Sequence, residues 1–252
     1  MTFNLQGKKA FITGSTSGIG LSIAQKLQDY GCKIAINSKN KESIENAKKL
    51  FKNPVNGIVG DMTSSKDSRK AIEEFIELYK TLDILICNVG SGKSAYPCLE
   101  TTDDWSESIS LNLFSATNPI SAAIKYLTKS EGVITCISTI CSNKMIENAP
   151  ITYSCAKAAL NRYIENSSFY FAKKNIRINA ISPGNVLFPG STWEEKLIKD
   201  RYAVETMIKR KVPLNKFVTP KDISEAVAFL SSPLSCSTTG QVLNVDAGQS
   251  II

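Results

Sequence analysis

The chain has 252 residues, of which 42% are hydrophobic and 21% are charged. This composition is too apolar for a disordered chain and supports a full hydrophobic core. Thirty Lys and Arg residues against 23 Asp and Glu give a net charge of +7, but the basic residues are scattered. A nucleic-acid-binding surface needs a concentrated basic stripe, so we expect no nucleic-acid partner.

Histidine is absent, which excludes Ser-His and Cys-His nucleophile pairs and His-based zinc sites. We therefore predict no metal site. The seven cysteines form no CxxC pair and several lie in apolar runs, a pattern typical of buried free thiols in a reducing compartment. The first residues lack a signal-peptide pattern, and no apolar stretch approaches the ~20 residues that cross a bilayer. We expect a cytoplasmic protein that does not contact a membrane.

Short apolar runs alternate with helical patterns along the chain. The predicted strands cover residues 9–13, 33–36, 55–59, 82–87, 133–137, 176–181 and 241–245. The predicted helices include one from Ile19 to a C-cap at Gly31, one over 41–51, one capped by Ser65, a long one from Thr102 through Ile124, and one starting at Thr219-Pro220. Continuous apolar strands are typical of a parallel sheet covered by helices on both faces. This predicts an α/β fold, with residues 1–252 as one Rossmann-like, doubly wound domain.

Residues 185–213 break this alternation. They hold Pro189, Gly190, Trp193 and a charged helix-like stretch, without a strand. Long segments after the carboxyl end of a strand usually build or cover a binding site. We expect this segment to cover a substrate, and compact surface decoration is the alternative.

A glycine-rich turn separates the first strand from the first helix. Gly14, Gly18 and Gly20 let the backbone approach a pyrophosphate, which would lie at the helix N-terminus. The second strand ends at Asn37-Ser38-Lys39, without the carboxylate that an NAD site places there. A hydroxyl, an amide and an ammonium suit a 2′-phosphate, which favours NADP over NAD. The alternative is that Lys39 is a solvated residue at the start of a helix.

Tyr153 and Lys157 lie four residues apart and therefore share one helix face. A neighbouring cation lowers the pKa of a phenol, so Tyr153 can exchange a proton with a substrate oxygen near neutral pH.

Several motifs occur in one order along nearly the whole chain. They are Thr13-Gly14-x-x-x-Gly18-Ile19-Gly20, Asp61, Asn88-Val89-Gly90, Asn112, Ser138-Thr139, Tyr153-x-x-x-Lys157, Pro183-Gly184 and Thr239 to Gly248. Together they resemble the short-chain dehydrogenase/reductase family. The resemblance implies a seven-stranded Rossmann fold, hydride transfer with NAD(P), and a homodimer or homotetramer.

The resemblance also implies roles for individual residues. Tyr153 would be the general acid/base, Lys157 would lower its pKa and hold the nicotinamide ribose, and Asn112 would support a proton-relay water. The substrate-orienting hydroxyl falls on Thr139, with Ser138 as the alternative because the loop to Tyr153 is one residue longer than the family pattern. The predicted cofactor-binding residues are Gly14, Ser15, Thr16, Ser17, Gly18, Ile19, Gly20, Asn37, Ser38, Lys39, Asp61, Met62, Asn88, Val89, Gly90, Tyr153, Lys157, Pro183, Gly184 and Val186.

The chain departs from the family pattern after Pro183-Gly184, where the usual Thr for the nicotinamide amide is missing. Either Ser191 or Thr192 substitutes, or the contact is lost. We expect an NADP-dependent oxidoreductase that interconverts a carbonyl and a secondary alcohol, on a sugar or surface-polysaccharide precursor that Lys93 and the Trp193 segment meet. A 3-oxoacyl thioester reductase is one alternative. The other is a non-catalytic NADP-sensing module, although such modules typically lose the Tyr or the Lys.

Overall fold

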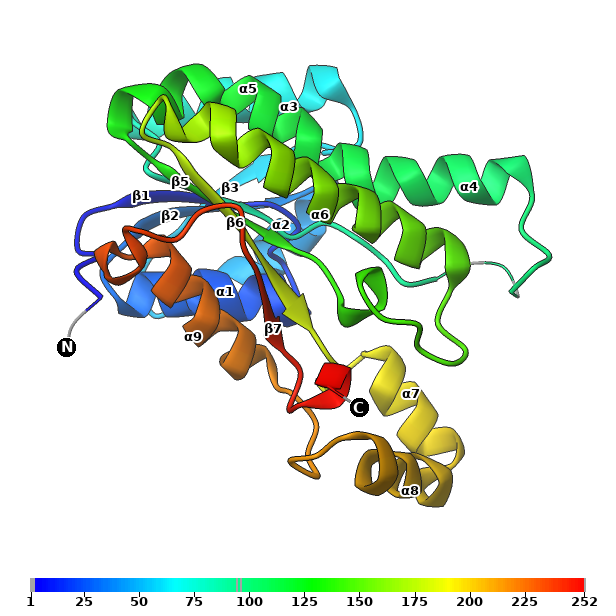
Figure 1. Cartoon of the computed structure of the whole chain (residues 1–252). Coiled ribbons are helices and arrows are strands. Elements are labelled where there is room, and N and C mark those ends of the chain that lie inside the picture. Colours follow the sequence, from blue (N-terminus) through cyan, green and yellow to red (C-terminus); the bar gives the residue numbers. More distant parts are fainter. Residues whose placement is uncertain (1–2, 94, 96, 252) are drawn as a thin grey trace.

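The computed structural model describes residues 3–93, 95 and 97–251 of the chain. A sheet of parallel strands runs through its centre (Figure 1). The strands are β1 (Lys9–Ile12), β2 (Lys33–Ser38), β3 (Asn56–Val59), β4 (Ile84–Cys87), β5 (Val133–Ile137), β6 (Arg177–Pro183) and β7 (Val242–Val245). Their order in the sheet is β3-β2-β1-β4-β5-β6-β7, so the direction of winding reverses between β1 and β4. Open α/β sheets bind ligands outside the carboxyl ends of the strands at this reversal. The predicted Rossmann-like fold is confirmed.

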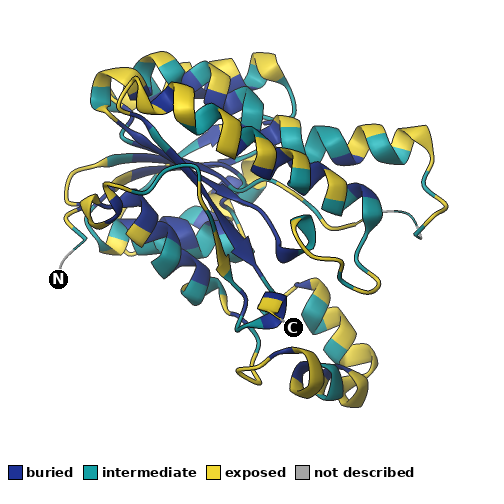
Figure 2. Ribbon diagram, in the orientation of Figure 1, coloured by how far each residue is buried: buried dark blue, intermediate teal, exposed yellow. Residues whose placement is uncertain are grey.

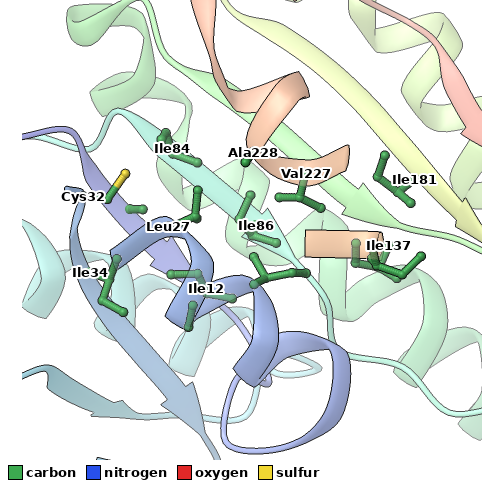
Figure 3. Packing of buried hydrophobic residues seen from close by; sticks show 14 of the residues in the cluster. Ile12, Leu27, Cys32, Ile34, Ile84, Ile86, Ile137, Ile181, Val227 and Ala228 are labelled. Carbon is green, nitrogen blue, oxygen red and sulfur yellow. The ribbon is translucent and has the colours of Figure 1, made fainter. Parts of the chain in front are cut away.

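Two layers of helices cover the sheet. Buried residues of α1 (Gly18–Asp29), α2 (Lys41–Lys48) and α9 (Pro220–Ser231) form a core on one face. Those of α3 (Ser65–Tyr79), α5 (Ser115–Ser130) and α6 (Ile151–Ala172) form a core on the other. Successive strand residues alternate between the two cores, so Ile12 and Ile86 lie in the first, shown in Figure 3, and Phe11 and Leu85 in the second. Both faces of the strands are therefore apolar, which explains the continuous apolar runs in the sequence.

The long helix predicted from Thr102 through Ile124 is divided in the structure. A π-helical turn, η1 (Ser110–Phe114), separates α4 (Thr102–Ile109) from α5. Pro119 in α5 has no N–H to donate to the carbonyl four residues earlier, that of Ser115. The Ser115 hydroxyl meanwhile donates to the Leu111 carbonyl at 2.5 Å. The regular bonding pattern is thus broken on both sides of Ser115, a known cause of π-bulges and kinks.

The helix boundaries refine the sequence expectations. Ser64, not Ser65, caps α3, because its hydroxyl accepts the Asp67 N–H at 3.2 Å. Thr219 caps α9 and Pro220 is the first helical residue, as expected. Gly31 follows α1 with a φ of +85°. No helix in the described part of the chain is long and apolar enough to cross a membrane.

The segment 185–213 forms two helices, α7 (Thr192–Lys199) and α8 (Arg201–Lys211). They project from the carboxyl end of the sheet beside β6 and β7 (Figure 1), and much of their surface is exposed (Figure 2). The other short helical turns are η2 (Ile140–Ser142), η3 (Pro233–Ser235) and η4 (Gln249–Ile251).

The cysteines divide between interior and surface. Cys32, Cys87 and Cys136 are buried, Cys141 is half-buried, and the other three are exposed. Cys87 and Cys136 are register partners on the adjacent strands β4 and β5.

Candidate active site

A cavity of about 1130 Å³ lies at the carboxyl ends of the strands. Among the predicted site residues it is lined by Gly14, Ser17, Gly18, Ile19, Gly20, Asn88, Val89, Gly90, Ser138, Thr139, Tyr153, Lys157, Pro183, Gly184 and Val186. A second cavity of about 380 Å³ is lined by Gly14, Asn37, Ser38, Lys39, Asp61, Met62 and Val89. Gly14 and Val89 line both, so the two cavities adjoin each other. Ser15, Thr16 and Asn112 line neither.

Buried polar side chains hold the glycine turn between β1 and α1. The Ser15 hydroxyl donates to the Ile12 carbonyl at 2.6 Å and accepts the Asn37 N–H at 2.9 Å. The Asn37 amide accepts the Gly14 N–H at 3.2 Å and donates to the carbonyls of Ile58 and Gly60. Ser15 and Asn37 therefore shape the turn. The Asn37 side chain is buried and bonded to Gly14, Ile58 and Gly60, although it also lines the smaller cavity, so its contact with a 2′-phosphate stays a prediction.

Asn88, after β4, fixes the same turn from the other side. Its side-chain amide donates to the Gly14 carbonyl at 2.8 Å, and its backbone N–H donates to the Thr13 hydroxyl at 3.0 Å. A Cβ at Gly20 would lie 2.4 Å from the Gly14 oxygen, so only glycine allows this close approach.

The N-terminus of α1 suits an anion. In the part of the chain that the structure describes, no side chain caps it: Ser17 is at the N-cap position without a side-chain bond to the helix. Its first turn carries no acidic residue. The free N–H groups and the positive end of the helix dipole therefore face the glycine cradle, an arrangement that fits the pyrophosphate of a dinucleotide.

Phe188 occupies the position where the family pattern has its Thr. A Cβ at Gly18 would lie 2.6 Å from the Phe188 ring, so the ring lies directly against the glycine turn. Ser191 lines the large cavity, and its hydroxyl caps α7 by accepting the N–H groups of Phe188 and Glu194, each at 3.2 Å. Thr192 lines the large cavity and is exposed.

Val186 presents backbone groups to the large cavity. It forms an isolated parallel bridge with Val218, made by bonds from the Val218 N–H to Asn185 and from the Leu187 N–H to Val218. In such a bridge the peptide groups of Val186 itself face away from Val218. They are therefore placed to meet a polar ligand group.

Tyr153 and Lys157 enter the cavity from the N-terminal half of α6. The Tyr153 hydroxyl lies beside that of Thr139, which follows β5, and both residues line the cavity. The Lys157 ammonium is buried and donates to the Ile137 carbonyl at 2.8 Å. Gly90 packs over it closely enough that a Cβ would lie 3.1 Å from its Nζ atom. Strand β5 and helix α6 thus bring a hydroxyl, a phenol and an ammonium group together.

Burial has the largest effect on the pKa values of Tyr153 and Lys157. It raises the pKa of Tyr153 to about 12, against a smaller lowering effect of the Thr139 hydrogen bond. Lys157 was expected to lower the pKa of Tyr153, whereas in the structure burial raises this pKa. Burial also lowers the pKa of Lys157 to about 8. At neutral pH Tyr153 is a neutral phenol, which can donate a proton to a carbonyl oxygen, and Lys157 is charged.

Ser138 and Thr139 have separate environments. The Ser138 hydroxyl donates to the Asn161 amide oxygen at 2.6 Å, and the Asn161 nitrogen donates to Ser142 at 2.7 Å. Ser138 is thereby committed to a buried network that ties η2 to α6. The geometry thus favours Thr139, which contacts Tyr153, as the substrate-orienting hydroxyl.

Asn112 acts through the backbone of a neighbouring loop. Its amide oxygen accepts the Ser91 N–H at 3.0 Å, and its nitrogen donates to the carbonyls of Ser91 and Ser108, each at 3.1 Å. A Cβ at Gly90 would lie 2.8 Å from the same oxygen. The Asn112 side chain thus holds the loop that covers Lys157, and its support of a proton-relay water stays a prediction.

Comparison with known proteins agrees with this geometry. A family model described as enoyl-(acyl carrier protein) reductase matches residues 14–250. The chain is 32% identical over 252 residues to a tropinone reductase homolog of Arabidopsis thaliana, across 98% of this chain and 93% of that protein. It is 31% identical over 251 residues to a 3-oxoacyl-(acyl-carrier-protein) reductase of Chlamydia trachomatis, across 97% and 98% of the two chains. The chain belongs to the short-chain dehydrogenase/reductase family.

A solved structure of similar shape is a gluconate 5-dehydrogenase from Burkholderia cenocepacia in complex with NADP and tartrate. It has a TM-score of 0.90 and 27% sequence identity, and the match covers 100% of this chain and 98% of that one. The protein is accordingly an oxidoreductase of the short-chain dehydrogenase/reductase family.

Sequence reasoning missed several residues that line the large cavity of this oxidoreductase. The structure adds Cys141, Met145, Ile146, Glu147, Trp193, Lys196, Met207, Lys211 and Gln249 to the lining. Trp193 belongs to the segment expected to cover the substrate, whereas the exposed Lys93 lines neither cavity. The added residues follow β5, β6 and β7, so the rule that ligands bind at carboxyl ends indicates the loops. It does not indicate which residues within them face inward.

Proposed function

We propose that the chain is an NADP-dependent oxidoreductase that interconverts a carbonyl and a secondary alcohol by hydride transfer. The observation that carries the proposal is the pair of neighbouring Thr139 and Tyr153 hydroxyls on the cavity wall, with Lys157 buried on the same face of α6 as Tyr153. Two hydroxyls and a cation at one point can bind and protonate a carbonyl oxygen as negative charge develops on it.

Each residue has a defined part in this scheme. The nicotinamide ring, when bound, supplies or accepts the hydride. Thr139 orients the carbonyl oxygen and Tyr153 transfers the proton, while the ammonium of Lys157 stabilises the negative charge and holds the cofactor ribose. Asn112 is a positioning residue that acts through Ser91 and Gly90.

The glycine turn, the α1 N-terminus and Val186 would hold the cofactor's pyrophosphate and nicotinamide. The adenosine end would lie in the smaller cavity with Asp61, whose carboxylate accepts the Thr63 N–H and hydroxyl. Lys39 and Ser38 line the same cavity and would meet the 2′-phosphate. The ammonium of Lys39 lies near enough to help lower the pKa of Asp61. It is therefore directed toward this cavity, not into bulk solvent alone.

The cofactor proposal is tested by measuring the affinities for NADPH and NADH. We expect the wild type to bind NADPH more tightly and Lys39→Ala to lose about tenfold or more of that preference, as a charge-assisted contact to phosphate predicts. Lys41→Ala is the matched control, because Lys41 is exposed at the start of α2 and does not line the smaller cavity. Equal wild-type affinity for both cofactors would contradict the proposal.

The catalytic proposal is tested with Tyr153→Phe. We expect it to abolish NADPH oxidation with little change in cofactor affinity, because the ring and Lys157 keep the pocket shape. A variant that retains more than about a tenth of the activity has lost less than ~1.4 kcal/mol of transition-state stabilisation. The proton would then come from another group.

Two substrate classes are supported. The similarity to a gluconate 5-dehydrogenase structure favours a sugar-type carbonyl compound, such as a surface-polysaccharide precursor. The 31% identity to a 3-oxoacyl-(acyl-carrier-protein) reductase favours a 3-oxoacyl thioester as the alternative. A panel of oxidised sugars, sugar nucleotides and oxoacyl thioesters assayed with NADPH distinguishes them. Tight NADPH binding without turnover of any member would indicate a sensing module.

We further propose that the protein is a cytoplasmic homodimer or homotetramer. The free thiols fit a reducing compartment. The exposed aromatic residues near the end of α6, Phe169 and Tyr170, provide apolar surface for a second copy.

A further inference from the structure

We infer that the substrate carries an anionic group, a carboxylate or a phosphate, and that Lys196 binds this group in the large cavity. The inference rests on the proposed oxidoreductase function and adds the chemical class of its substrate. It comes from the position of Lys196 and from the balance of charge on the cavity wall.

Lys196 belongs to α7 and lines the large cavity. Its ammonium lies 4.4 Å from the centre of the Trp193 ring, an arrangement that holds a cation against an aromatic face. Trp193 in turn packs against Phe217, with ring centres 5.8 Å apart. Lys196 is exposed, and the contact with Trp193 favours a position of its ammonium on the cavity wall.

The charged side chains that line this cavity are, within the described ranges, three lysines and one glutamate. Lys211 is paired with the glutamate, Glu147, at 2.6 Å. Lys157 is buried beside Tyr153 and bonded to a carbonyl. Lys196 has no carboxylate within ion-pair distance in residues 3–93, 95 and 97–251. The cavity therefore has an excess of positive charge. Lys211 is neutralised by Glu147 and Lys157 is assigned to the reaction, so the positive charge of Lys196 remains available for a ligand.

Cys141 connects Lys196 to the reacting groups. It lines the cavity and follows Thr139 by two residues, and the positive charge of Lys196 acts to lower the pKa of its thiol. An anion on Lys196 and a carbonyl on Tyr153 and Thr139 would therefore share one cavity. Ile146, Met207 and the Trp193 ring provide apolar wall for the carbon skeleton of the substrate.

Lys199 offers a matched control. It is on the same helix, three residues further along, and is exposed, but it does not line the cavity. A general effect of positive charge on α7 would depend equally on both lysines, whereas a site at Lys196 depends on one.

The binding test compares tartrate with threitol, which has the same four-carbon hydroxylated skeleton without the carboxylates. Affinity is measured with NADP⁺ present, by calorimetry and by tryptophan fluorescence, for which Trp193 is the local reporter. We expect wild type to bind tartrate about tenfold or more tightly than threitol, as a charge-assisted contact predicts. Lys196→Gln should remove that difference, Lys196→Arg should retain most of it, and Lys199→Gln should leave it unchanged.

Three results would overturn the inference: no tartrate binding by wild type, equal binding of tartrate and threitol, or equal loss in the Lys196→Gln and Lys199→Gln variants. Glycerol 3-phosphate against glycerol forms a second arm, which separates preference for phosphate from preference for carboxylate.

A turnover test separates this inference from the proposed function. NADPH oxidation is measured with acetoacetate and with ethyl acetoacetate, which present the same ketone with and without the charge. A Lys196-dependent preference for acetoacetate supports both. Equal reduction of both compounds by wild type and by Lys196→Gln keeps the oxidoreductase function and overturns the anion site. Lys196-dependent tartrate binding without reduction of any carbonyl compound keeps the anion site and contradicts the function.

Discussion

Ser138 and Thr139 are neighbours in the chain, yet their side chains have different surroundings: the Ser138 hydroxyl donates to Asn161, whereas the Thr139 hydroxyl lies beside that of Tyr153. We expect Thr139→Ala to lower kcat about 10²–10³-fold, because a donor to the developing oxyanion is lost. Thr139→Ser keeps the hydroxyl and should be mild. Steady-state kinetics with saturating cofactor measures the difference.

The same pair provides the control. Ser138→Ala leaves the Asn161 amide oxygen without its donor and should lower the free energy of unfolding by about 1–2 kcal/mol, with a small change in kcat. Urea unfolding gives the stability and the same assay gives the rate. A large rate effect of Ser138→Ala, with a harmless Thr139→Ala, would transfer the orienting role to Ser138.

Lys157 is proposed to act in the reaction, but burying its charge lowers the stability of the folded protein. Its pKa falls from 10.5 to about 8 on burial, and each pKa unit corresponds to about 1.4 kcal/mol, so burying the charge costs on the order of 3 kcal/mol at neutral pH. Between pH 8 and 10.5 the unfolded chain binds more protons at this site than the folded chain, so this cost disappears as pH rises through that window.

Lys157→Met should therefore abolish turnover and raise the stability at pH 7 by about 1–2 kcal/mol, since loss of the bond to Ile137 offsets part of the gain. Urea unfolding at pH 7 and above pH 10 tests this. The advantage of the variant should shrink at the higher pH, and a variant less stable than wild type at pH 7 would contradict the argument.

The same pKa predicts how cofactor capture depends on pH. The ratio kcat/KM for NADPH reports groups of the free enzyme, and it should fall as pH rises through about 8, where Lys157 loses its proton. Tyr153, with a pKa of about 12, remains a proton donor throughout this range. A profile that stays flat to pH 10 would exclude Lys157 as the controlling group.

The sequence predicted the parts of the site that depend on short spacings. The glycine turn and the Tyr153–Lys157 pair each lie within one turn or one helix face, so residue spacing was sufficient to find them. The use of Asn37 and the raised pKa of Tyr153 depend on burial and on partners far along the chain. Spacing carries no information about either, and the expected lowering of the Tyr153 pKa was corrected.

At the scale of the elements, η1 shows where helix periodicity misleads. The apolar pattern from Thr102 through Ile124 fits a continuous helix, whereas Pro119 and Ser115 divide it. The extra backbone residue brings Asn112 to Ser91, where it bonds both backbone groups of that residue. Periodicity records which face is apolar, and a single π turn alters it too little to be detected.

Helix α6 carries apolar residues on more than one face. Leu160 and Ile164 pack on the sheet, while Phe169 and Tyr170 are 61% and 65% exposed. A helix that is apolar beyond its core-facing stripe usually has a second partner. We expect the double substitution Phe169→Glu and Tyr170→Glu to weaken self-association in multi-angle light scattering, because like charges would face each other across a two-fold axis.

Leu50→Glu, at an exposed apolar residue after α2, is the control and should leave the assembly unchanged. A wild-type protein that is monomeric at micromolar concentration would contradict the expected oligomer, and an unchanged assembly in the double variant would place the interface elsewhere.

At the scale of the whole molecule, the parallel sheet covered by helices could be predicted from the sequence, whereas the position of the lobe formed by α7 and α8 could not. The central strands are continuous apolar runs buried on both faces, the edge strands β3 and β7 are partly exposed, and the predicted strand limits differ from the observed ones by at most two residues. The lobe buries few side chains, chiefly Val204 and Ile208 on α8. The sequence shows a charged helix-like stretch there, but a segment that buries so little does not indicate where it packs.

The seven thiols differ in burial, so the rate at which each reacts reports which part of the protein opens. An alkylating reagent should modify Cys98, Cys155 and Cys236 at once, whereas Cys32, Cys87 and Cys136 should react only when the sheet and its helices separate. Cys141, half-buried in the cavity wall, should react at an intermediate rate that a bound substrate analogue slows. Intact-mass spectra collected over time would thus resolve surface, cavity and core in one unaltered chain, and would distinguish a local movement of the lobe from unfolding of the whole protein.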